Sequence, residues 1–250
     1  MRFSKFYFLI ILLNCYNLNY CQITKVIYKF SKTSLGIDST SIKTKIANSG
    51  ISQSQTKLIR EFLNLNDKFE FELLFNENES LYQKVVKLSS DNKENDIIGM
   101  SDKLYNNKYY KNVKDTTKQI ITNDYGNYKI KLPYNDLVWK VTSETKIING
   151  YKCFKAETVK TDFYNPVKHS RTVFYPVVWF CSEIPAKFGP IGLDGLPGLV
   201  LEASLNGKKY LIATSIIFNY NYKIDLNKYS KYSLLTTSEF EKILGQNLGF

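Results

Sequence analysis

Short runs of alternating apolar and polar residues, rich in β-branched and aromatic side chains, recur along most of the chain. The segment ITKVIYKFSK (23–32) shows this alternation, and two similar runs flank Asn76–Ser80. More short runs fill residues 103–160, where Asn149-Gly150 is a strong hairpin-turn signal. Alternation with a period of two is typical of strands that bury one face. The pattern therefore predicts a mainly β fold assembled from antiparallel hairpins.

Two more hairpins are expected in the second half. GYKCFKAETVK (150–160) and RTVFYPVVWFCSEIP (171–185) form one long hairpin if the chain turns near Val167. Pro176 interrupts its second strand and indicates a bulge or an edge, because proline cannot donate a backbone hydrogen bond. Asn206-Gly207 joins another pair of strands, 198–205 and 208–219.

Two helices complete the expected fold. Residues 52–65 (SQSQTKLIREFLNL) carry an apolar stripe at helical spacing, and Ser238–Glu241 reads as a capping box that starts a short C-terminal helix. No internal repeat or interdomain linker is apparent. We therefore expect a single domain over residues 22–250, an α+β protein with one curved antiparallel sheet or half-barrel and these two helices.

The N-terminal residues have the pattern of a secretory signal peptide. Arg2 and Lys5 precede an apolar run, Phe6–Leu13, and a polar stretch leads to Cys21. The apolar run is far shorter than the roughly 20 residues that span a bilayer. Residues 1–21 are expected to be removed, with cleavage before Gln22, and no later segment is long and apolar enough to cross a membrane. The protein is expected to be exported, to the periplasm by default, with the outer-membrane surface and the medium as alternatives.

The charge and the scarcity of reactive residues restrict the functions to be considered. The net charge is +11, but lysines are spread along the chain rather than clustered, which predicts a basic surface and no nucleic-acid partner. His169 is the only histidine, and the common hydrolase, nucleotide-binding and zinc motifs are absent. No metal or cofactor is therefore expected, and the oligomeric state stays open.

Two cysteines remain after the signal peptide, and an even number in an exported chain favours a disulfide. Cys153 and Cys181 are equally far from Val167. They would face one another in the long hairpin, within the distance that a disulfide spans. The sequence therefore predicts a Cys153–Cys181 disulfide.

The stretch GPIGLDGLPGLVLEA (189–203) places a glycine at every third position from Gly189 to Gly198. It is too short for a collagen helix and lacks the spacing of a nucleotide-binding loop. A small anion-binding nest and a structural corner remain. We favour the corner, in which Leu196-Pro197 leads Gly198 into a type II turn, so that Gly195 and Gly198 adopt positive φ. Its expected residues are Gly189, Pro190, Gly195, Leu196, Pro197, Gly198 and Leu199.

The residues around this corner resemble the GLPGLI family of exported proteins from Bacteroidetes. The resemblance covers residues 136–205 and depends on a set of motifs in a shared order: Trp139, TSETKIINGYKCFKA (142–156), WFCSEIP (179–185) and FGPIGLDGLPGLVLEA (188–203). Leu193, Val200 and Cys181 depart from the usual residues of the family. Cys181 stands where the family commonly has threonine, so the resemblance implies no family-wide disulfide, and the expected one rests on this chain's own cysteines. The resemblance implies an exported protein and assigns it no chemistry.

Two functional hypotheses follow. The first is a non-enzymatic envelope protein whose sheet binds a hydrophobic or acyl ligand, or a protein partner, through some of its many aromatic residues. The second is a hydrolase that uses carboxylates near the motif, with Glu183, Asp194 and Glu202 as the acid–base candidates. Carboxylates beside a turn are more often solvated or cap backbone N–H groups, so we favour binding.

Overall fold

The computed structural model describes residues 22–31, 52, 69–85, 105–166 and 169–247. Its strands are β1 (Ile23–Phe30), β2 (Glu70–Phe75), β3 (Glu79–Lys84), β4 (Lys108–Asn112), β5 (Thr117–Thr122), β6 (Tyr128–Lys131), β7 (Lys140–Ile148), β8 (Tyr151–Glu157), β9 (Lys160–Asn165), β10 (Ser170–Phe174), β11 (Val177–Cys181), β12 (Leu199–Ser204), β13 (Leu211–Tyr220) and β14 (Ser233–Leu235). The helical elements are two short 3₁₀ turns, η3 (Pro190–Gly192) and η4 (Asn227–Tyr229), and the helix α5 (Thr237–Asn247).

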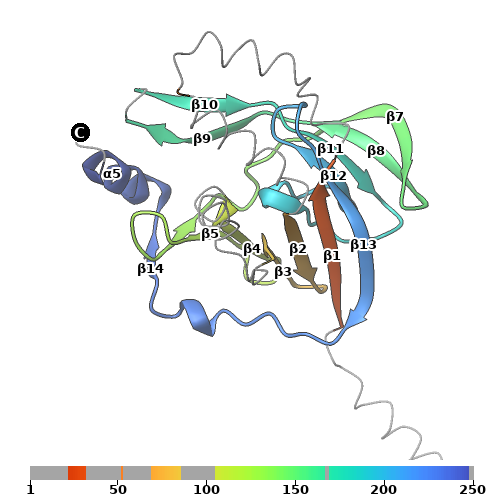
Figure 1. Cartoon of the computed structure of the whole chain (residues 1–250), viewed down its shortest axis with the longest axis horizontal. Helices are drawn as coiled ribbons and strands as arrows, with labels where there is room; N and C mark the ends of the chain where they lie inside the picture. The colour runs from red at the N-terminus through yellow and green to blue at the C-terminus, as the bar shows by residue number, and fades with distance from the viewer. Residues whose placement is uncertain (1–21, 32–51, 53–68, 86–104, 167–168, 248–250) are drawn as a thin grey trace, which may run out of the picture.

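One large, open and curved sheet dominates the described part of the chain (Figure 1). Its strand order is β14-β6-β5-β4-β3-β2-β1-β13-β12-β11-β8-β7, and β9 and β10 form a separate ribbon. Neighbours in the sheet are antiparallel, apart from the parallel pair β14–β6. This confirms the mainly β, curved-sheet expectation and the C-terminal helix. The expected helix over 52–65 lies outside the described residues, apart from Ser52.

The centre of the sheet joins segments that are distant in sequence. β1 pairs along one edge with β2 and along the other with β13, so that Ile23 is opposite Tyr220 and Phe30 is opposite Leu211. On one side of this centre, β2 to β6 follow one another as a meander. On the other side, β12, β11, β8 and β7 complete the sheet. The curvature brings the two sides together around a shared apolar core.

The hairpins follow the turn signals of the sequence. Asn149 and Gly150 link β7 to β8 with φ angles of 51° and 84°, the positive values that a tight hairpin turn requires. In the long hairpin, β8 pairs with β11, with Val177 opposite Glu157, and its outer part continues as the β9–β10 ribbon. Pro176 lies where the ribbon leaves the sheet, and its carbonyl accepts from the Thr158 N–H (3.1 Å). The predicted irregularity at this proline is confirmed.

Helix α5 starts with a capping box, but not the predicted one. The Thr236 hydroxyl accepts from the Glu239 N–H (3.2 Å), and the Glu239 carboxylate accepts from the Thr236 N–H (2.7 Å). The box therefore begins two residues before Ser238, because Thr236 supplies the same hydroxyl in the same spacing. These hydrogen bonds to Thr236 lower the pKa of Glu239. Glu241 instead pairs with Arg171 of the ribbon (2.5 Å), which attaches the helix to β10.

Candidate ligand-binding site

The glycine-rich stretch folds as a corner within the concave side of the sheet. Leu193 and Leu196 are buried against Val178 and Phe180, and η3 lies against β3 and β4. The N–H groups of Leu193 and Gly195 donate to carbonyls of Pro190 and Lys187 (3.0 and 3.1 Å). These N–H groups therefore serve the corner itself rather than an anion nest. The structural-corner interpretation fits this geometry.

Two of its glycines are needed for different reasons. Gly195 has a φ of +93°, as the sequence predicted. Gly198 does not have positive φ, so the expected type II turn with Gly198 at its third position is wrong. Instead, a Cβ at Gly198 would lie 2.1 Å from the carbonyl oxygen of Cys181. The position is closed to other residues by the close approach of β11 rather than by its backbone conformation.

Asp194 projects from this corner into a buried cluster of charges. Lys111 Nζ donates to Asp194 Oδ1 (2.5 Å), and Lys118 Nζ lies 3.1 Å from Asp194 Oδ2. Lys118 also pairs with Asp136 (2.5 Å). The side chains of Lys111, Lys118 and Asp194 are only 6%, 3% and 8% exposed. The expectation that Asp194 is a surface or capping group is wrong, because β4 and β5 present two lysines to it.

The other two acid–base candidates have partners of their own. Glu202, on β12, pairs with Lys146 (2.7 Å) and is buried, so it is not a surface group either. Glu183 is exposed, and one of its carboxylate oxygens accepts from the Lys152 N–H (3.3 Å). Within the described ranges, no hydrogen bond or ion pair brings two of the three candidates together. The hydrolase hypothesis therefore gains no paired-carboxylate geometry.

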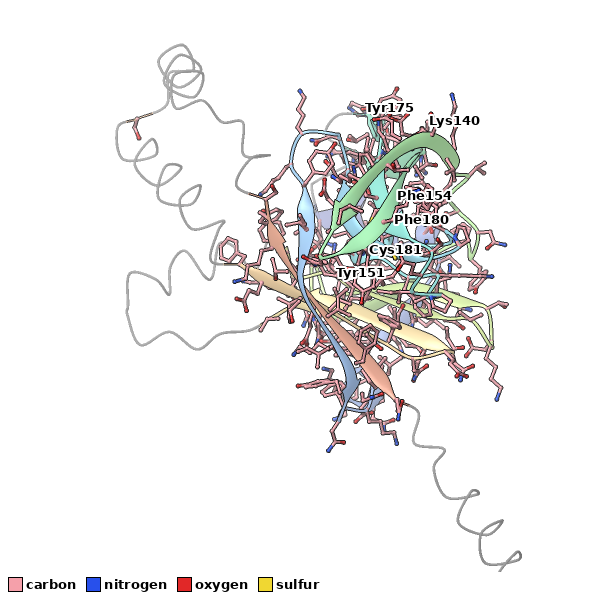
Figure 2. All side chains as sticks on the ribbon, turned by 90° about the vertical axis from the view of Figure 1, so that its right-hand side faces the viewer. Lys140, Tyr151, Phe154, Tyr175, Phe180 and Cys181 are labelled. Carbon is pink, nitrogen blue, oxygen red and sulfur yellow. The ribbon has the colours of Figure 1, made fainter. Side chains whose placement is uncertain are left out.

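Cys153 and Cys181 lie next to one another in the core. The register that puts Phe180 opposite Phe154 carries Cys181 alongside Cys153 on the neighbouring strand. Figure 2 labels Phe154 of β8 and its neighbours Phe180 and Cys181 of β11. Both are buried and present as free thiols. Burial, followed by the nearby Cys181, raises the pKa of Cys153 to about 12. The predicted facing arrangement fits this register, while the bond itself stays a prediction.

A cavity of about 270 Å³ opens between the corner and the centre of the sheet. We call it the aromatic pocket. Its described lining is rich in aromatic rings and is completed by aliphatic and polar residues of η3, β12, β13 and the turn between the last two: Phe30, Phe71, Tyr82, Tyr105, Asn107, Tyr109, Ile191, Ala203, Ser204, Leu205, Asn206, Lys209 and Leu211. Ile191 of η3 belongs both to the corner and to the lining of the pocket. It has a positive φ of 51° and packs against the apolar core of the sheet.

The aromatic rings form a continuous wall, in which Phe30 and Tyr105 pack edge to face on Phe71 and Tyr82 stacks on it. Phe71 is central, with its ring centroid 5.4 Å from those of Phe30 and Tyr105 and 5.9 Å from that of Tyr82. Tyr82 is 2% exposed, yet its hydroxyl has no hydrogen-bond partner within the described part of the chain. The Asn107 side-chain oxygen is buried and unpartnered in the same sense. Unsatisfied buried polar atoms are uncommon in folded proteins, and these two are closed off from the open part of the pocket.

Burial also governs the ionisation of the pocket. It raises the pKa of Tyr105 to about 12 and that of Tyr109 to about 12, so both hydroxyls stay neutral at physiological pH. It raises the pKa of Tyr82 as well. Lys209 responds in the opposite sense, because burial disfavours its charged form and lowers its pKa to about 8. Its Nζ lies 3.7 Å from the Phe30 ring centroid and donates to the Tyr105 hydroxyl (2.9 Å).

The fold and the site define an open curved β sheet that carries a small, aromatic-lined pocket. Two solved structures of PNGF-II, in space groups C2 and P21, are similar to it with TM-scores of 0.52 and 0.53 at 17% sequence identity. The matches cover 89% of this chain but only 32% and 33% of PNGF-II, so the chain spans about a third of its length. At this identity the likeness shows the fold alone. No protein-family model matches the chain, and no curated protein matches its sequence.

No local pattern in the sequence indicates this pocket. Its aromatic residues come from β1, β2, β3, β4 and the residues just before β4, and the fold of the sheet brings them together. Lys209 follows the Asn206-Gly207 turn and is indistinguishable in sequence from the exposed Lys208. In the ranges that the structure covers, no group of three His, Cys, Asp or Glu side chains is placed to hold a metal ion. No helix there is long and apolar enough to cross a membrane.

Proposed function

We propose that this protein is a non-enzymatic binding protein that holds a small hydrophobic molecule in the aromatic pocket. The observation that carries the proposal is a cavity of about 270 Å³ whose described lining is rich in aromatic rings. Ligand sites typically combine predominantly apolar walls with a few polar groups that orient the ligand. An apolar molecule of modest size would bury its surface against Phe30, Phe71 and Leu211, and each buried methylene group would contribute about 0.8 kcal/mol.

The proposed setting is the cell envelope. The signal-peptide pattern of residues 1–21 and the resemblance to the GLPGLI family both support export of the chain. An envelope protein partner is the second candidate for the bound molecule. The small volume of the aromatic pocket, about 270 Å³, favours a small molecule over a protein surface. The carboxylate hydrolase ranks below both, because Asp194 and Glu202 are each engaged by lysines.

A neutral fluorescent probe tests the binding proposal. N-Phenyl-1-naphthylamine is expected to bind the purified mature protein with an increase in fluorescence, since it exchanges water for aromatic walls. Leu205→Trp places a bulky ring on the lining of the pocket and should weaken binding at least about tenfold, the loss of about 1.4 kcal/mol. Val138→Trp, at a position that is 86% exposed, is the matched control and should bind like the wild type. Equal binding by both variants would place the probe elsewhere and refute the proposal.

We further propose that Cys153 and Cys181 form a disulfide when the chain folds in an oxidising compartment. Their neighbouring strands and mutual burial support it. The raised pKa of Cys153 makes its thiolate scarce once the core has closed, so the bond should form before or during folding. Mass spectrometry of exported protein, alkylated in denaturant without reductant, should show no alkyl group on either cysteine. Two alkylated sulfurs would contradict the prediction.

A further inference from the structure

A second cavity, of about 630 Å³, lies between the sheet and the β9–β10 ribbon, and we call it the ribbon cleft. Its described lining comes mainly from β4, β5, β6, the ribbon and helix α5. The ribbon contacts α5, and α5 also contacts β6 and β14 (Figure 1). Among their described lining residues, the ribbon cleft and the aromatic pocket share only Asn107 and Tyr109. The ribbon cleft is therefore a separate candidate site.

Lys160 is the residue of this cleft whose contacts are unusual. It begins β9, and its Nζ lies 5.7 Å from the Tyr109 ring centroid. Within the described ranges, this nitrogen makes no hydrogen bond and no ion pair. The neighbouring Lys118, in contrast, is bound by Asp136 and Asp194. Lys160 is thus an amine at the wall of a cavity whose lone pair or charge is not engaged by those acids.

The surroundings of Lys160 favour its neutral form. Burial is the largest cause that lowers the pKa of Lys160, and the positive charge of Lys118 lowers it further. The carboxylates of Asp136, Asp162 and Asp194 oppose this shift without cancelling it. A lysine that is desolvated, or that lies beside another cation, becomes a nucleophile, and lysines of this kind form Schiff bases with carbonyl compounds.

The rest of the lining indicates which carbonyl compounds the ribbon cleft accepts. Apolar side chains of β6, the following loop and α5 offer a surface for a carbon chain: Ile130, Leu132, Phe240 and Leu244. Apart from Lys160, the described acidic and basic side chains of the lining are Asp124, Asp136, Asp162 and Arg171. Arg171 is already paired with Glu241. The carboxylates therefore disfavour an anionic molecule and leave a neutral, apolar one as the best fit.

We propose that Lys160 binds an apolar aldehyde or ketone in the ribbon cleft as a reversible imine. The Lys160 nitrogen attacks the carbonyl carbon with its lone pair, and the carbonyl oxygen receives a proton from the nitrogen to give a carbinolamine. The hydroxyl group then leaves with the remaining proton of the nitrogen as water, and the C=N bond forms. Asp136 and Asp162, which favour a positive charge on Lys160, would also stabilise the protonated imine. The inference goes beyond the proposed function, because it concerns a second cavity and a covalent bond.

Hexanal and sodium cyanoborohydride test this step on the purified mature protein, because reduction converts each imine into a stable secondary amine. After a brief reaction at pH 7, mass spectrometry of Glu-C peptides locates the hexyl groups. Lys160 should be labelled at least about tenfold faster than the exposed Lys114 and Lys208. Glyoxylate, an aldehyde with an anionic group, should show no such preference for Lys160.

Two variants of α5 test whether the carbonyl compound uses the cleft. Leu244→Trp places a bulky ring on its lining and should slow the hexanal labelling of Lys160 at least about tenfold. Lys242→Trp changes an exposed position of the same helix and should leave the labelling unchanged. Circular dichroism checks that both variants are folded.

The pH dependence distinguishes an activated amine from one that is merely accessible. Competitive acetylation with trace acetic anhydride measures the neutral fraction of each lysine as the pH rises. Because the pKa of Lys160 is lowered, its acetylation should reach half of its maximal rate below about pH 10.4, the ordinary lysine value.

Three results would each overturn the inference. These are hexanal labelling of Lys160 no faster than that of Lys114, equal labelling of Lys160 in Leu244→Trp and the wild type, and a half-maximal acetylation rate at or above the ordinary pH. A preference of Lys160 for glyoxylate would likewise contradict the apolar ligand class. The proposed function has its own test, since N-phenyl-1-naphthylamine and Leu205→Trp report on the aromatic pocket.

Discussion

Replacing Asp194 with alanine is expected to lower the free energy of unfolding by about 3–5 kcal/mol, the range observed when one partner of a buried ion pair is removed. Lys111 and Lys118 both bind Asp194, and their side chains are only 6% and 3% exposed. Without the carboxylate, two ammonium groups remain in a weakly solvated site with Asp136 as the only other described acid that pairs with them. Urea denaturation of the purified variant measures the loss.

A matched control separates burial from ion pairing as such. Glu144 also pairs with a lysine, Lys155 (2.8 Å), but its side chain is 57% exposed. Glu144→Ala should cost no more than about 1 kcal/mol, as is usual for surface pairs. Asp194→Asn preserves the volume and removes the charge, and should also destabilise the protein strongly. If Asp194→Ala and Glu144→Ala lowered the free energy of unfolding equally, the buried charge cluster would not contribute more to stability than a surface ion pair.

Gly198→Ala should destabilise the protein by about 1–3 kcal/mol or more, the usual cost of overpacking a closed site. The added methyl group would lie 2.1 Å from the Cys181 carbonyl oxygen and 2.6 Å from its carbonyl carbon. These are backbone atoms of β11, which is held between β8 and β12 and cannot move aside as a flexible side chain would. Thermal and urea unfolding of the variant provide the measurement.

Gly150→Ala isolates the conformational part of such a substitution. Gly150 has a φ of +84°, and a Cβ there would meet no atom within 4 Å. Its cost should be about 1 kcal/mol, from backbone strain alone. A Gly198→Ala variant that is no less stable than Gly150→Ala would mean that β11 gives way easily. The close approach of the two strands would then not explain the glycine.

The sequence was sufficient for local structure because turn chemistry acts over a few residues. Asn149-Gly150 and Asn206-Gly207 specified their hairpins, and the symmetry about Val167 led to the observed register of β8 and β11. The start of α5 was misplaced because Thr236–Glu239 and Ser238–Glu241 present the same spacing of hydroxyl and carboxylate. Local pattern alone cannot rank two such boxes, and the strand pairing of β14 with β6 decides where the chain enters the helix.

Most of the candidate site could not be predicted from the sequence, because its residues are distant in sequence and only the order of the strands in the sheet brings them together. Asp194 looked like a turn carboxylate, and nothing near it in sequence indicates that β4 and β5 bring Lys111 and Lys118 to it. The same holds for the aromatic pocket, whose residues span Phe30 to Leu211. Glycine is required at Gly198, but the sequence predicted the wrong reason, a turn with positive φ. The actual reason is a close contact with β11, and such a contact cannot be distinguished from a turn in the local sequence.

The pairing of β1 with β13 has a consequence for the order in which the chain acquires its structure. Ile23 and its partner Tyr220 are 197 positions apart (220 − 23), so one edge of the first strand stays unpaired until β13 has been synthesised. Strand pairs of such high sequence separation form slowly, because the chain loses the entropy of a long loop before any stabilising contact forms. An apolar strand with an open edge is also a template for aggregation. The growing chain therefore passes through a long stage in which one edge of its central strand has no partner strand.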